Sequence, residues 1–367
     1  MGCDEAIFSL NKTIDYFTSQ GSTVNVCSLD LAKAFDRVDH SLLFNKLMDR
    51  KVPKVFIELL KSWYDKSYSK IKWGNSMSNR VKLLAGVRQG GILSPLLFAI
   101  FVDDLLVKLS NLRLGCCING LSFNAIMYAD DLILLSISVH ELQILVDICV
   151  SEFKCLRLEI NVGKSACMRI GPRHKIDPQH ININLSPMPW KTEIRYLGIH
   201  FLSANKFKLN LQPARQKFYG ALNGIFGRVG TKTSPHLLLS LIKTFCFPII
   251  LYGLVRIILD KNIYTSLNST LFVACGKIFS TYNKLILEQC LYYLYVLPLD
   301  MQLDFNKLNW YSKTYDLDNF YLVMLMCKVG RHEAFNIQNK FSIRQLDNRF
   351  VIKDKFFNFF KLKCDAS

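Results

Sequence analysis

Two adjacent aspartates, Asp130 and Asp131, lie between two short apolar runs, and this arrangement constrains the fold more than any other feature. The runs span residues 121–127 and 132–137. Both contain β-branched or aromatic residues and are bounded by polar ones, so each is predicted to be a strand. The carboxylates are then expected at the tip of a tight hairpin, where their mutual repulsion opposes burial. A divalent metal ion is the usual source of the compensating positive charge.

The charge of the chain is unevenly distributed. The 367 residues are 50% hydrophobic, which is enough for a large core or two packed subdomains. The net charge is +17, of which +12 belongs to residues 204–367 and +5 to the first 203 residues. A basic second half beside a more balanced first half favours a polyanionic partner, with a merely soluble basic surface as the alternative.

The cysteines and the apolar runs indicate in which cellular compartment the chain works and whether it enters a membrane. None of the 12 cysteines forms a C-x-x-C pair, and none has a histidine at zinc-ligand spacing. Without a secretory signal peptide, this pattern predicts a reducing, intracellular compartment and not secretion. The longest apolar run, residues 245–255, is interrupted by Pro248 and Gly253 and is shorter than the ~18 residues of a membrane span. We therefore expect a buried helix interrupted by proline, and no membrane partner.

The periodicity of apolar residues predicts the order of the elements. Gly74-Asn75 and Asn119-Gly120 are expected at hairpin turns, and Ser41 and Ser94 are expected to be helix N-caps. The predicted helices span residues 4–19, 42–49, 54–68, 94–109 and 139–157, and the predicted strands residues 23–31, 165–170, 181–185 and 194–202.

From about residue 206 the pattern becomes helical and basic, over residues 206–228 and 234–256 and then to 296. The change from strands to basic helices predicts a domain boundary near residue 203. We expect one domain over residues 1–203, a helical domain over residues 204–296, and a C-terminal region of unknown role over residues 297–367.

A third aspartate completes a set of metal ligands. Asp30 ends a predicted strand, as Asp130 and Asp131 end another, and carboxylate oxygens are the ligands that hard divalent cations take. Two such ions about 4 Å apart serve phosphoryl transfer. A second aspartate pair, Asp103 and Asp104, lies within a predicted helix four residues before Lys108, and is interpreted as a solvated helix face.

Five motifs in order carry a resemblance to a known family. The motifs are Asp30-Leu-Ala-Lys-Ala-Phe35-Asp36, Arg88-Gln-Gly-Gly-Ile-Leu-Ser-Pro95, Tyr128-Ala-Asp-Asp131, Leu158-Glu-Ile-Asn161-Val-Gly-Lys164-Ser165 and Arg195-Tyr-Leu-Gly198. With these motifs in this order, the sequence resembles the palm of reverse transcriptases of the non-LTR retrotransposon kind, over about residues 4–202. This resemblance implies an α+β fold, a right-hand polymerase palm with an antiparallel sheet covered by helices, followed by a helical thumb.

The resemblance implies a catalytic centre. Asp30, Asp130 and Asp131 would bind two Mg²⁺ ions, or Mn²⁺, with the backbone carbonyl of Leu31 assisting. Lys164 matches the residue proposed as general acid toward the pyrophosphate leaving group. An exposed lysine without a catalytic role is the alternative, because a general acid also needs a geometry that sequence does not show.

The resemblance also implies residues that touch the substrates. Phe35 matches the steric gate that favours deoxynucleotides, with an ordinary core aromatic as the alternative. Arg88, Gln89 and Gly90 match the nucleotide-binding loop, where small residues allow backbone amides to approach a ligand. A surface arginine is the alternative for Arg88.

Tyr196, Leu197 and Gly198 match the primer grip, with an aromatic packed between strands as the alternative for Tyr196. The implied partners are an RNA template, a DNA primer, their RNA–DNA hybrid and dNTP substrates. The basic residues expected to contact the phosphates of the hybrid are Lys206, Lys208, Arg215, Lys217, Arg228 and Lys232.

Only 29 residues precede Asp30, which is too short for the fingers subdomain of the family, and no endonuclease domain is found. The chain is therefore expected to be a palm and thumb from a longer polyprotein, working in the nucleus or cytoplasm. The leading hypothesis is an RNA-directed DNA polymerase. The alternatives are an inactive remnant that only binds nucleic acid, and another two-metal palm enzyme such as a nucleotide cyclase, against which the Arg88–Pro95 string argues.

Overall fold

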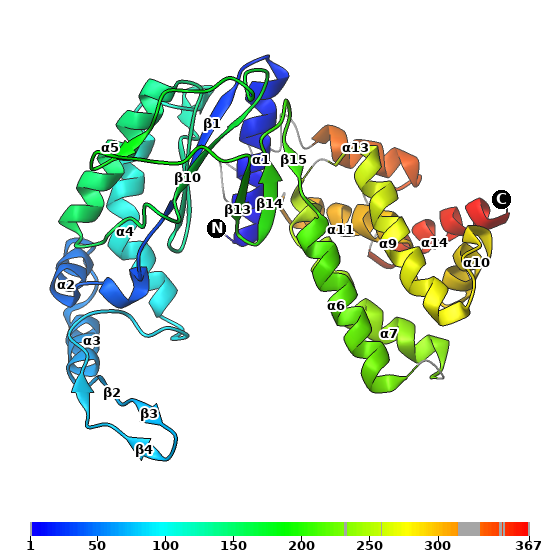
Figure 1. Cartoon of the computed structure of the whole chain (residues 1–367), viewed down its shortest axis with the longest axis horizontal. Coiled ribbons are helices and arrows are strands. Elements are labelled where there is room, and N and C mark those ends of the chain that lie inside the picture. Colours follow the sequence, from blue (N-terminus) through cyan, green and yellow to red (C-terminus); the bar gives the residue numbers. More distant parts are fainter. Residues whose placement is uncertain are drawn as a thin grey trace. The chain divides into compact units, whose positions relative to one another are not determined.

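The computed structural model describes residues 2–230, 233–257, 259–314, 331–344, 347 and 349–365 (Figure 1). The chain divides into two compact units. The sheet unit comprises Phe17–Tyr196 and Leu202–Phe207, and the helical unit comprises Met1–Tyr16, Leu197–Phe201 and Lys208–Ser367. The first sixteen residues thus group with the helices of the second half of the chain, whereas the sequence places them with the first domain.

A four-stranded antiparallel sheet forms the centre of the sheet unit. Its strand order is β10-β1-β9-β8, where β1 is Val24–Asp30, β8 is Ala125–Tyr128, β9 is Asp131–Ser136 and β10 is Ala166–Ile170. All three pairings are antiparallel. Nearly every residue of the strands β9, β1 and β10 is buried, which requires layers on either side of the sheet.

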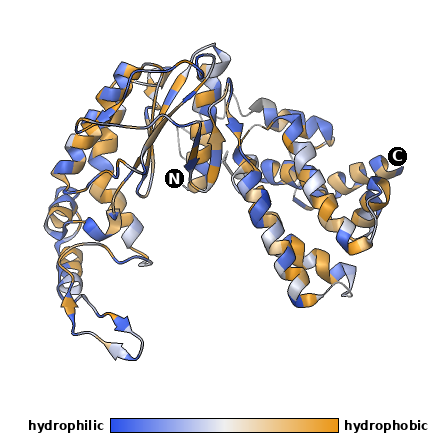
Figure 2. Cartoon of the chain, in the orientation of Figure 1, coloured by the Kyte–Doolittle hydropathy of each residue, from blue (hydrophilic) through white to orange (hydrophobic). Residues whose placement is uncertain are grey.

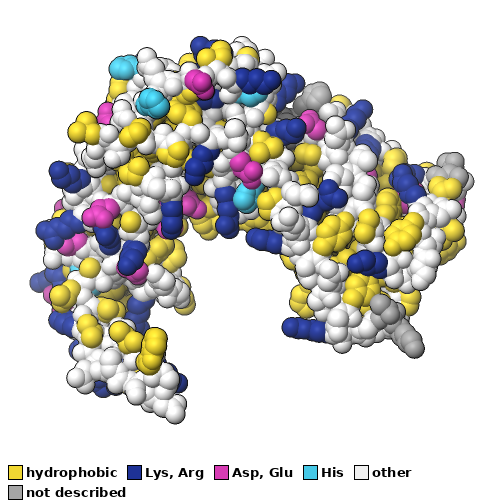
Figure 3. Space-filling view, viewed as in Figure 1, with side chains coloured by type: hydrophobic (Ala, Val, Ile, Leu, Met, Phe, Trp, Pro, Cys, Tyr) yellow, Lys and Arg dark blue, Asp and Glu magenta, His cyan; other side chains and the backbone are white. Residues whose placement is uncertain are grey.

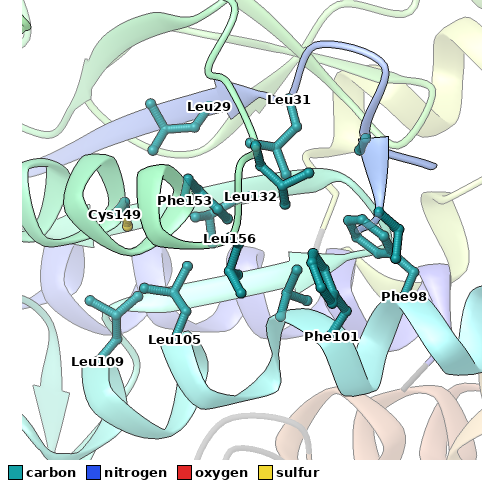
Figure 4. Close-up of a cluster of buried hydrophobic side chains, with 14 of the residues drawn as sticks. Leu29, Leu31, Phe98, Phe101, Leu105, Leu109, Leu132, Cys149, Phe153 and Leu156 are labelled. Carbon is teal, nitrogen blue, oxygen red and sulfur yellow. The ribbon is translucent and has the colours of Figure 1, made fainter. Parts of the chain in front are cut away.

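Two long helices supply much of the core beneath the sheet. They are α4 (Ser94–Asn111) and α5 (Val139–Cys155). Figure 4 shows their side chains meeting those of β1 and β9, with Phe98 and Phe101 of α4 both 0% exposed. Each fully buried side chain of this size contributes about 1.5–3 kcal/mol through removal of apolar surface from water. This cluster therefore holds the strands that carry Asp30 and Asp131 in a rigid frame.

Shorter elements complete the sheet unit. The helical ones are η1 (Ala34–Arg37), α2 (His40–Asp49) and α3 (Lys54–Asp65). The short strands are β2 (Tyr68–Ser69), β3 (Lys72–Trp73), β4 (Ser76–Met77), β5 (Val81–Lys82), β6 (Cys117–Ile118), β7 (Leu121–Ser122), β11 (Asn182–Ile183), β12 (Ser186–Pro187) and β13 (Glu193–Tyr196).

The predicted hairpins are confirmed, while two predicted helix caps are wrong. β3 pairs with β4 and β6 with β7 around the expected turns. The N-cap of α2 is Asp39, whose carboxylate accepts the Leu42 N–H at 3.0 Å, and not Ser41. The N-cap of α4 is Leu93, and the Ser94 hydroxyl instead donates to the Arg88 carbonyl. Ser94 therefore closes the loop before the helix.

The helical unit contains α1 (Cys3–Ser19) up to Tyr16 and the helices that follow residue 208. In Figure 2, apolar and polar residues alternate along these helices, as amphipathic packing requires. Its other elements are β14 (Ile199–Leu202, up to Phe201), β15 (Lys208–Leu209), α6 (Gln212–Val229), α7 (Pro235–Phe245), α8 (Phe247–Leu251), η2 (Leu254–Arg256), α9 (Lys261–Phe279), α10 (Lys284–Tyr293), α11 (Leu299–Thr314), α13 (Arg331–Lys340) and α14 (Arg349–Asp365).

A buried ionic network joins three helices of this unit. Lys307 of α11 donates to the Ile257 carbonyl at 2.8 Å and pairs with Glu333 of α13. Lys12 of α1 lies 3.8 Å from the same carboxylate and is fully buried. Burial lowers the pKa of Lys12, which the nearby Glu333 partly opposes. The contact ties α1 to the C-terminal helices.

The apolar run of residues 245–255 is not one helix. α7 ends at Phe245, and Pro248 lies in the first turn of the separate helix α8, where it has no need of an N–H donor. Among the described residues, no helix is both long and apolar enough to cross a bilayer. The described cysteines are free thiols, and Cys327 lies outside the described residues.

The predicted fold class is confirmed. The structure is α+β, with an antiparallel sheet covered by helices and a helical C-terminal half. The predicted strand at residues 23–31 and the helices at residues 139–157 and 54–68 match β1, α5 and α3 to within a few residues.

Candidate active site

The pairing of β1 with β9 brings two of the three predicted carboxylates together. Asp30 lies directly opposite Asp131 in the register of the two strands, although 100 positions separate them in sequence. Directly opposed residues of an antiparallel pair have Cβ atoms about 4.5–5.5 Å apart on the same face. Tyr128 pairs with Asp131, so Ala129 and Asp130 form the predicted two-residue hairpin turn. Ala129 adopts φ 52°, a left-handed conformation that this type of turn requires.

Burial and the neighbouring carboxylates disfavour the ionised form of Asp131. Burial raises the pKa of Asp131, and the neighbouring charges of Asp130 and then Asp30 raise it further, while Arg195 lowers it. The three carboxylates are half-buried. Arg195 offsets these effects only in part, so the charge of Asp131 is undercompensated and a positively charged ligand at this point would stabilise its ionised form.

The donor set fits a site that is completed by substrate. Among the described residues, no group of three or more His, Cys, Asp or Glu side chains is arranged to hold a metal ion by itself. Mg²⁺ in phosphoryl-transfer sites is usually held by one or two carboxylates together with phosphate oxygens and water. Asp30 and Asp131, with Asp130 adjacent, supply that smaller set of hard oxygen donors. The residues present therefore fit a divalent ion shared with a phosphate-bearing substrate.

The backbone of Asp30 is held from both sides by one turn. The Asp30 N–H donates to the Ser165 hydroxyl at 3.1 Å, and its carbonyl accepts the Asn161 N–H at 2.8 Å. The Ser165 hydroxyl in turn donates to the Asn161 carbonyl at 2.8 Å. The next residue, Leu31, is buried and forms an isolated bridge with Ile160. The residues that position the first carboxylate are therefore Asn161 and Ser165, for which the sequence motif suggested no role.

Lys164 lies on that same turn. Its side chain is exposed, and its N–H donates to Asn161 Oδ1 at 3.3 Å and to the Asn161 carbonyl at 3.2 Å. The turn thus presents an exposed amine on the segment that holds Asp30. The structure leaves both interpretations of Lys164 open, since no described contact fixes its ammonium group.

Phe35 packs on the core and leaves one face partly open. It belongs to the short helix η1, which begins after Lys33 at φ 51°. Its ring stacks on Phe98 of α4, with centroids 4.8 Å apart and planes inclined by 25°. Its carbonyl accepts the Val87 N–H at 2.7 Å. Phe35 is half-buried, so it is neither a free surface ring nor a fully enclosed core residue.

The loop of residues 86–91 lies against the segment that carries Phe35. Gly86 adopts φ 93°, and a Cβ there would stand 2.8 Å from the Asp36 carbonyl oxygen, so only glycine allows this approach. Gln89 Nε2 donates to Asp36 Oδ1 at 3.0 Å. Gly90 is exposed with φ 79° and open space around it. Of the predicted loop residues, Gln89 and Gly90 therefore have the accessible backbone or amide that a bound nucleotide would need.

Arg88 points to an aromatic side chain. Its guanidinium carbon lies 5.8 Å from the centroid of the Trp63 ring. A cavity of about 570 Å³ lies beside the loop. It is lined by Asp36, Tyr64, Ser67, Leu83, Ala85, Gly86, Val87, Arg88 and Gln89.

The predicted primer-grip residues fall on either side of the unit boundary. Tyr196 ends β13 in the sheet unit and is 2% exposed. In the helical unit, Leu197 and Gly198 adopt φ 45° and 84°, as a two-residue hairpin turn requires. The Tyr252 hydroxyl donates to the Leu197 carbonyl at 3.0 Å. The turn adjoins a cavity of about 480 Å³ within the helical unit, whose lining includes Tyr252 and Lys217.

The second aspartate pair lies on an exposed helix face, as predicted, and has a structural role. Asp103 and Asp104 of α4 accept hydrogen bonds from Arg50 at 2.8 and 3.2 Å, and Asp104 also pairs with Lys46. Lys108 pairs instead with Glu152 of α5 at 2.6 Å. The pair therefore joins α2 and α4 on the surface.

The basic residues predicted to contact a nucleic acid are mostly accessible. Those that are exposed are Lys206, Lys208, Lys217 and Arg228. Arg215 is half-buried, and its Nε atom is buried without a hydrogen-bond partner. Lys232 lies outside the described residues.

Comparison with known proteins assigns the chain to a family. Residues 5–201 match the description "Reverse transcriptase (RNA-dependent DNA polymerase)". The chain is 28% identical over 219 residues to the "Retrovirus-related Pol polyprotein from type-2 retrotransposable element R2DM" of Drosophila melanogaster, covering 57% of this chain and 20% of the relative. It is 26% identical over 260 residues to an R2 Pol polyprotein of Popillia japonica, covering 68% and 41%.

Similarity extends to another retrotransposon polymerase and to a solved structure. The "RNA-directed DNA polymerase from mobile element jockey" of Drosophila funebris is 27% identical over 202 residues, covering 52% of this chain and 21% of the relative. The structure of apo telomerase from Candida tropicalis aligns with a TM-score of 0.44 at 11% identity, covering 96% of this chain and 56% of that one. The chain spans less than half the length of each of these retrotransposon proteins. With the match over residues 5–201, the chain belongs to the reverse transcriptase family, related to the enzymes of non-LTR retrotransposons.

Proposed function

We propose that this chain is an RNA-directed DNA polymerase that extends a DNA primer with dNTPs on an RNA template. The observation that carries the proposal is the register of β1 and β9, which sets Asp30 opposite Asp131 beside Asp130. Family membership supports the reaction class, and the undercompensated carboxylates support a cationic ligand that the substrate phosphates would share. Retrotransposon relatives support a non-LTR element as the source of the chain.

In this proposal Asp30, Asp130, Asp131 and the Leu31 carbonyl bind two Mg²⁺ ions. When bound, such ions activate the attacking hydroxyl and stabilise the leaving oxygen in phosphoryl transfer. The chain supplies orientation, because the Asn161–Ser165 turn fixes the backbone of Asp30 and the paired strands fix Asp131.

The remaining site residues act on the substrates. Phe35, supported from behind by Phe98, lies under the sugar and excludes a 2′-hydroxyl. Gln89 and Gly90 face the nucleotide, and Arg88 contacts a phosphate. Lys164 donates a proton to the pyrophosphate oxygen as it leaves, for which its exposed position on the turn below Asp30 provides reach.

The second half of the chain holds the product. Residues 204–296 form a thumb whose exposed lysines and arginines contact the phosphates of the RNA–DNA hybrid. Tyr196, Leu197 and Gly198 contact the primer, and residues 297–367 have no assigned role. Phosphate contacts of this kind give affinity without sequence preference and weaken as salt is added.

Primer extension tests the proposal. Wild-type protein, an RNA template, a DNA primer, dNTPs and Mg²⁺ are expected to give extended DNA, and Asp130→Ala is expected to abolish it. Asp103→Ala is the matched control, because it removes a carboxylate from the other aspartate pair, which joins α2 and α4 through Arg50 and Lys46 at the surface. Extension that is equal in wild type and Asp130→Ala would refute the proposal.

One alternative has a specific observation in its favour. The helical half carries most of the net charge, so the chain could bind an RNA–DNA hybrid without catalysing extension. Hybrid binding that is unchanged in Asp130→Ala, combined with no extension by the wild type, would support this binding-only function.

A further inference from the structure

A projecting arm of the sheet unit has an unusual surface. The arm comprises residues 66–84 and contains the pairs β2–β5 and β3–β4 (Figure 1). Every residue from Tyr68 to Leu84 is exposed. The exposed apolar side chains include Ile71 (66%), Trp73 (85%) and Met77 (58%). A hairpin with no buried face gains little stability from such residues, so their presence points to a ligand that covers them.

The charge of the arm indicates what that ligand carries. No acidic residue occurs from Lys66 to Val102. The same stretch contains six basic residues, namely Lys66, Lys70, Lys72, Arg80, Lys82 and Arg88. On the face of the arm in Figure 3, hydrophobic and basic side chains lie beside one another. A surface of one sign, accessible over its whole length, is complementary to a polyanion.

Aromatic rings are interleaved with these cations. The guanidinium of Arg80 lies 4.4 Å from the centroid of the half-exposed Tyr68 ring. Trp73 stands between Lys72 and the turn, with no aromatic contact of its own among the described residues. Exposed rings alternating with lysines are the combination that binds single strands, because each base stacks on a ring and each phosphate meets a cation. A duplex offers no free base face to Trp73.

The base of the arm leads to the candidate active site. Leu83 donates its N–H to the Ser67 carbonyl at 3.1 Å, which closes the arm at its root. Ser67 and Leu83 line the cavity of about 570 Å³ that Arg88 and Gln89 also line. The arm and the nucleotide-binding loop therefore belong to one unit and share a wall.

We propose that the arm binds single-stranded RNA and guides the template toward the active site, with Trp73 as a stacking platform. The template role rests on the proposed polymerase function, whereas binding of the single strand by the arm does not. Lys82 pairs with Asp65 at the root of the arm, at 3.4 Å, and the other basic residues of the arm have no ion pair among the described residues. This excess of positive charge favours nucleic acid over a protein partner or a second copy of the chain.

Binding can be measured apart from catalysis. The full chain in EDTA, without dNTPs, is titrated into a short fluorescent oligo(U) RNA, and the same is done with oligo(dT). Trp73→Ala is expected to weaken RNA binding about tenfold, and Trp73→Phe, which keeps a ring, to retain most of the affinity. In the double variant Lys70→Ala, Lys72→Ala, the logarithm of the association constant should fall less steeply with the logarithm of the salt concentration. The magnitude of this slope is expected to decrease by about 1.4.

Matched controls lie elsewhere on the sheet unit. Leu185→Ala removes an equally exposed apolar side chain from the β11–β12 turn, and Lys154→Ala with Lys175→Ala removes two exposed lysines outside the arm. These variants are expected to bind RNA as the wild type does. Equal losses in the arm and control variants would overturn the proposal, as would an unchanged affinity of Trp73→Ala.

Further outcomes separate the two proposals. Arm variants that lose RNA binding while the wild type fails to extend primers would support the arm and refute the polymerase. Primer extension that depends on Asp130, combined with arm variants of unchanged RNA affinity, would support the polymerase and refute the arm. The wild type could also run as a dimer in size-exclusion chromatography. If Trp73→Ala made it monomeric without changing its affinity for RNA, the arm would be an interface between copies, and the proposal would be overturned. Tighter binding of oligo(dT) than of oligo(U) would overturn the assignment to RNA.

Discussion

Replacing Asp131 by asparagine should stabilise the protein in the absence of divalent ions. The side chain keeps its shape but loses the charge that faces Asp30 and Asp130. Burial and these two carboxylates raise the pKa of Asp131, which means that ionising it costs free energy in the folded state. The substitution removes that cost while leaving the strand pairing of β1 and β9 in place.

The magnitude follows from the register of the strands. Directly opposed carboxylates about 5 Å apart repel by about 3 kcal/mol at an effective dielectric constant of about 20. Asp131 is half-buried and Arg195 offsets part of the repulsion, so solvent screening reduces the gain to about 1–2 kcal/mol. For a domain of this size, that corresponds to an increase in Tm of about 2–8 °C.

Thermal unfolding in EDTA, followed between pH 4 and pH 8, measures the effect. Since the folded-state pKa of Asp131 lies above its unfolded value, the destabilisation is fully present above the folded pKa. It disappears as both states become protonated toward the unfolded value of about 3.9. The advantage of Asp131→Asn should therefore be greatest at pH 8 and shrink as the pH falls through the folded-state pKa toward pH 4. Added Mg²⁺ or Mn²⁺ should stabilise the wild type more than the variant, because the ion binds only the folded state.

The control is Asp103→Asn, at an exposed carboxylate that accepts a hydrogen bond from Arg50 at 2.8 Å. Its loss should change stability by about 0–1 kcal/mol in the destabilising direction. An Asp131→Asn protein that is no more stable than the wild type at pH 8 in EDTA would refute the inference that the carboxylates repel one another. A Mg²⁺ response equal in both proteins would separately refute the divalent site.

Four further substitutions test other parts of the structure. Phe35→Ala should lower the preference for dNTPs over rNTPs at least about tenfold in primer extension, and an unchanged ratio would exclude the gate. Ser165→Ala leaves the partly buried Asp30 N–H without this acceptor, so it should cost about 0.5–1.5 kcal/mol in denaturant unfolding. Gly171→Ala should cost about 1–3 kcal/mol or more, because its Cβ would lie 2.6 Å from the Ser22 carbonyl oxygen. Gly220→Ala, with open space around the Cβ, should instead stabilise α6 by about 0.5–1 kcal/mol, and a loss of stability there would contradict the packing.

Local chemistry explains which elements the sequence predicted well. Glycine and asparagine at Gly74-Asn75 and Asn119-Gly120 favour tight turns whatever surrounds them, and both hairpins form. Apolar residues at helical spacing predicted α5 to within two residues. The cap of α2 was predicted wrongly, because Asp39 and Ser41 are both good N-cap residues and the choice depends on where the preceding chain turns.

The sequence identified the residues of the candidate site by type, but it did not predict which of them contact one another. The carboxylates and motifs identified the family, but partners of the site residues depend on contacts between distant segments. Arg88 lies near Trp63, Gln89 donates to Asp36, and Ser165 accepts from Asp30, and none of these pairings follows from periodicity. The arm is similar, since its basic and aromatic residues are visible in the sequence but their exposure is not.

The sequence by itself determined that Asp130 and Asp131 lie at a hairpin tip, because two short apolar runs around a two-residue turn have few other ways to pair. Only the tertiary structure decided that Asp30 stands opposite Asp131, since that register requires β1 to be inserted between β9 and β10. It also decided that α1 packs with the C-terminal helices, through Lys12 and Glu333. Both outcomes depend on burying surfaces far apart in sequence, and no local pattern records which surface meets which.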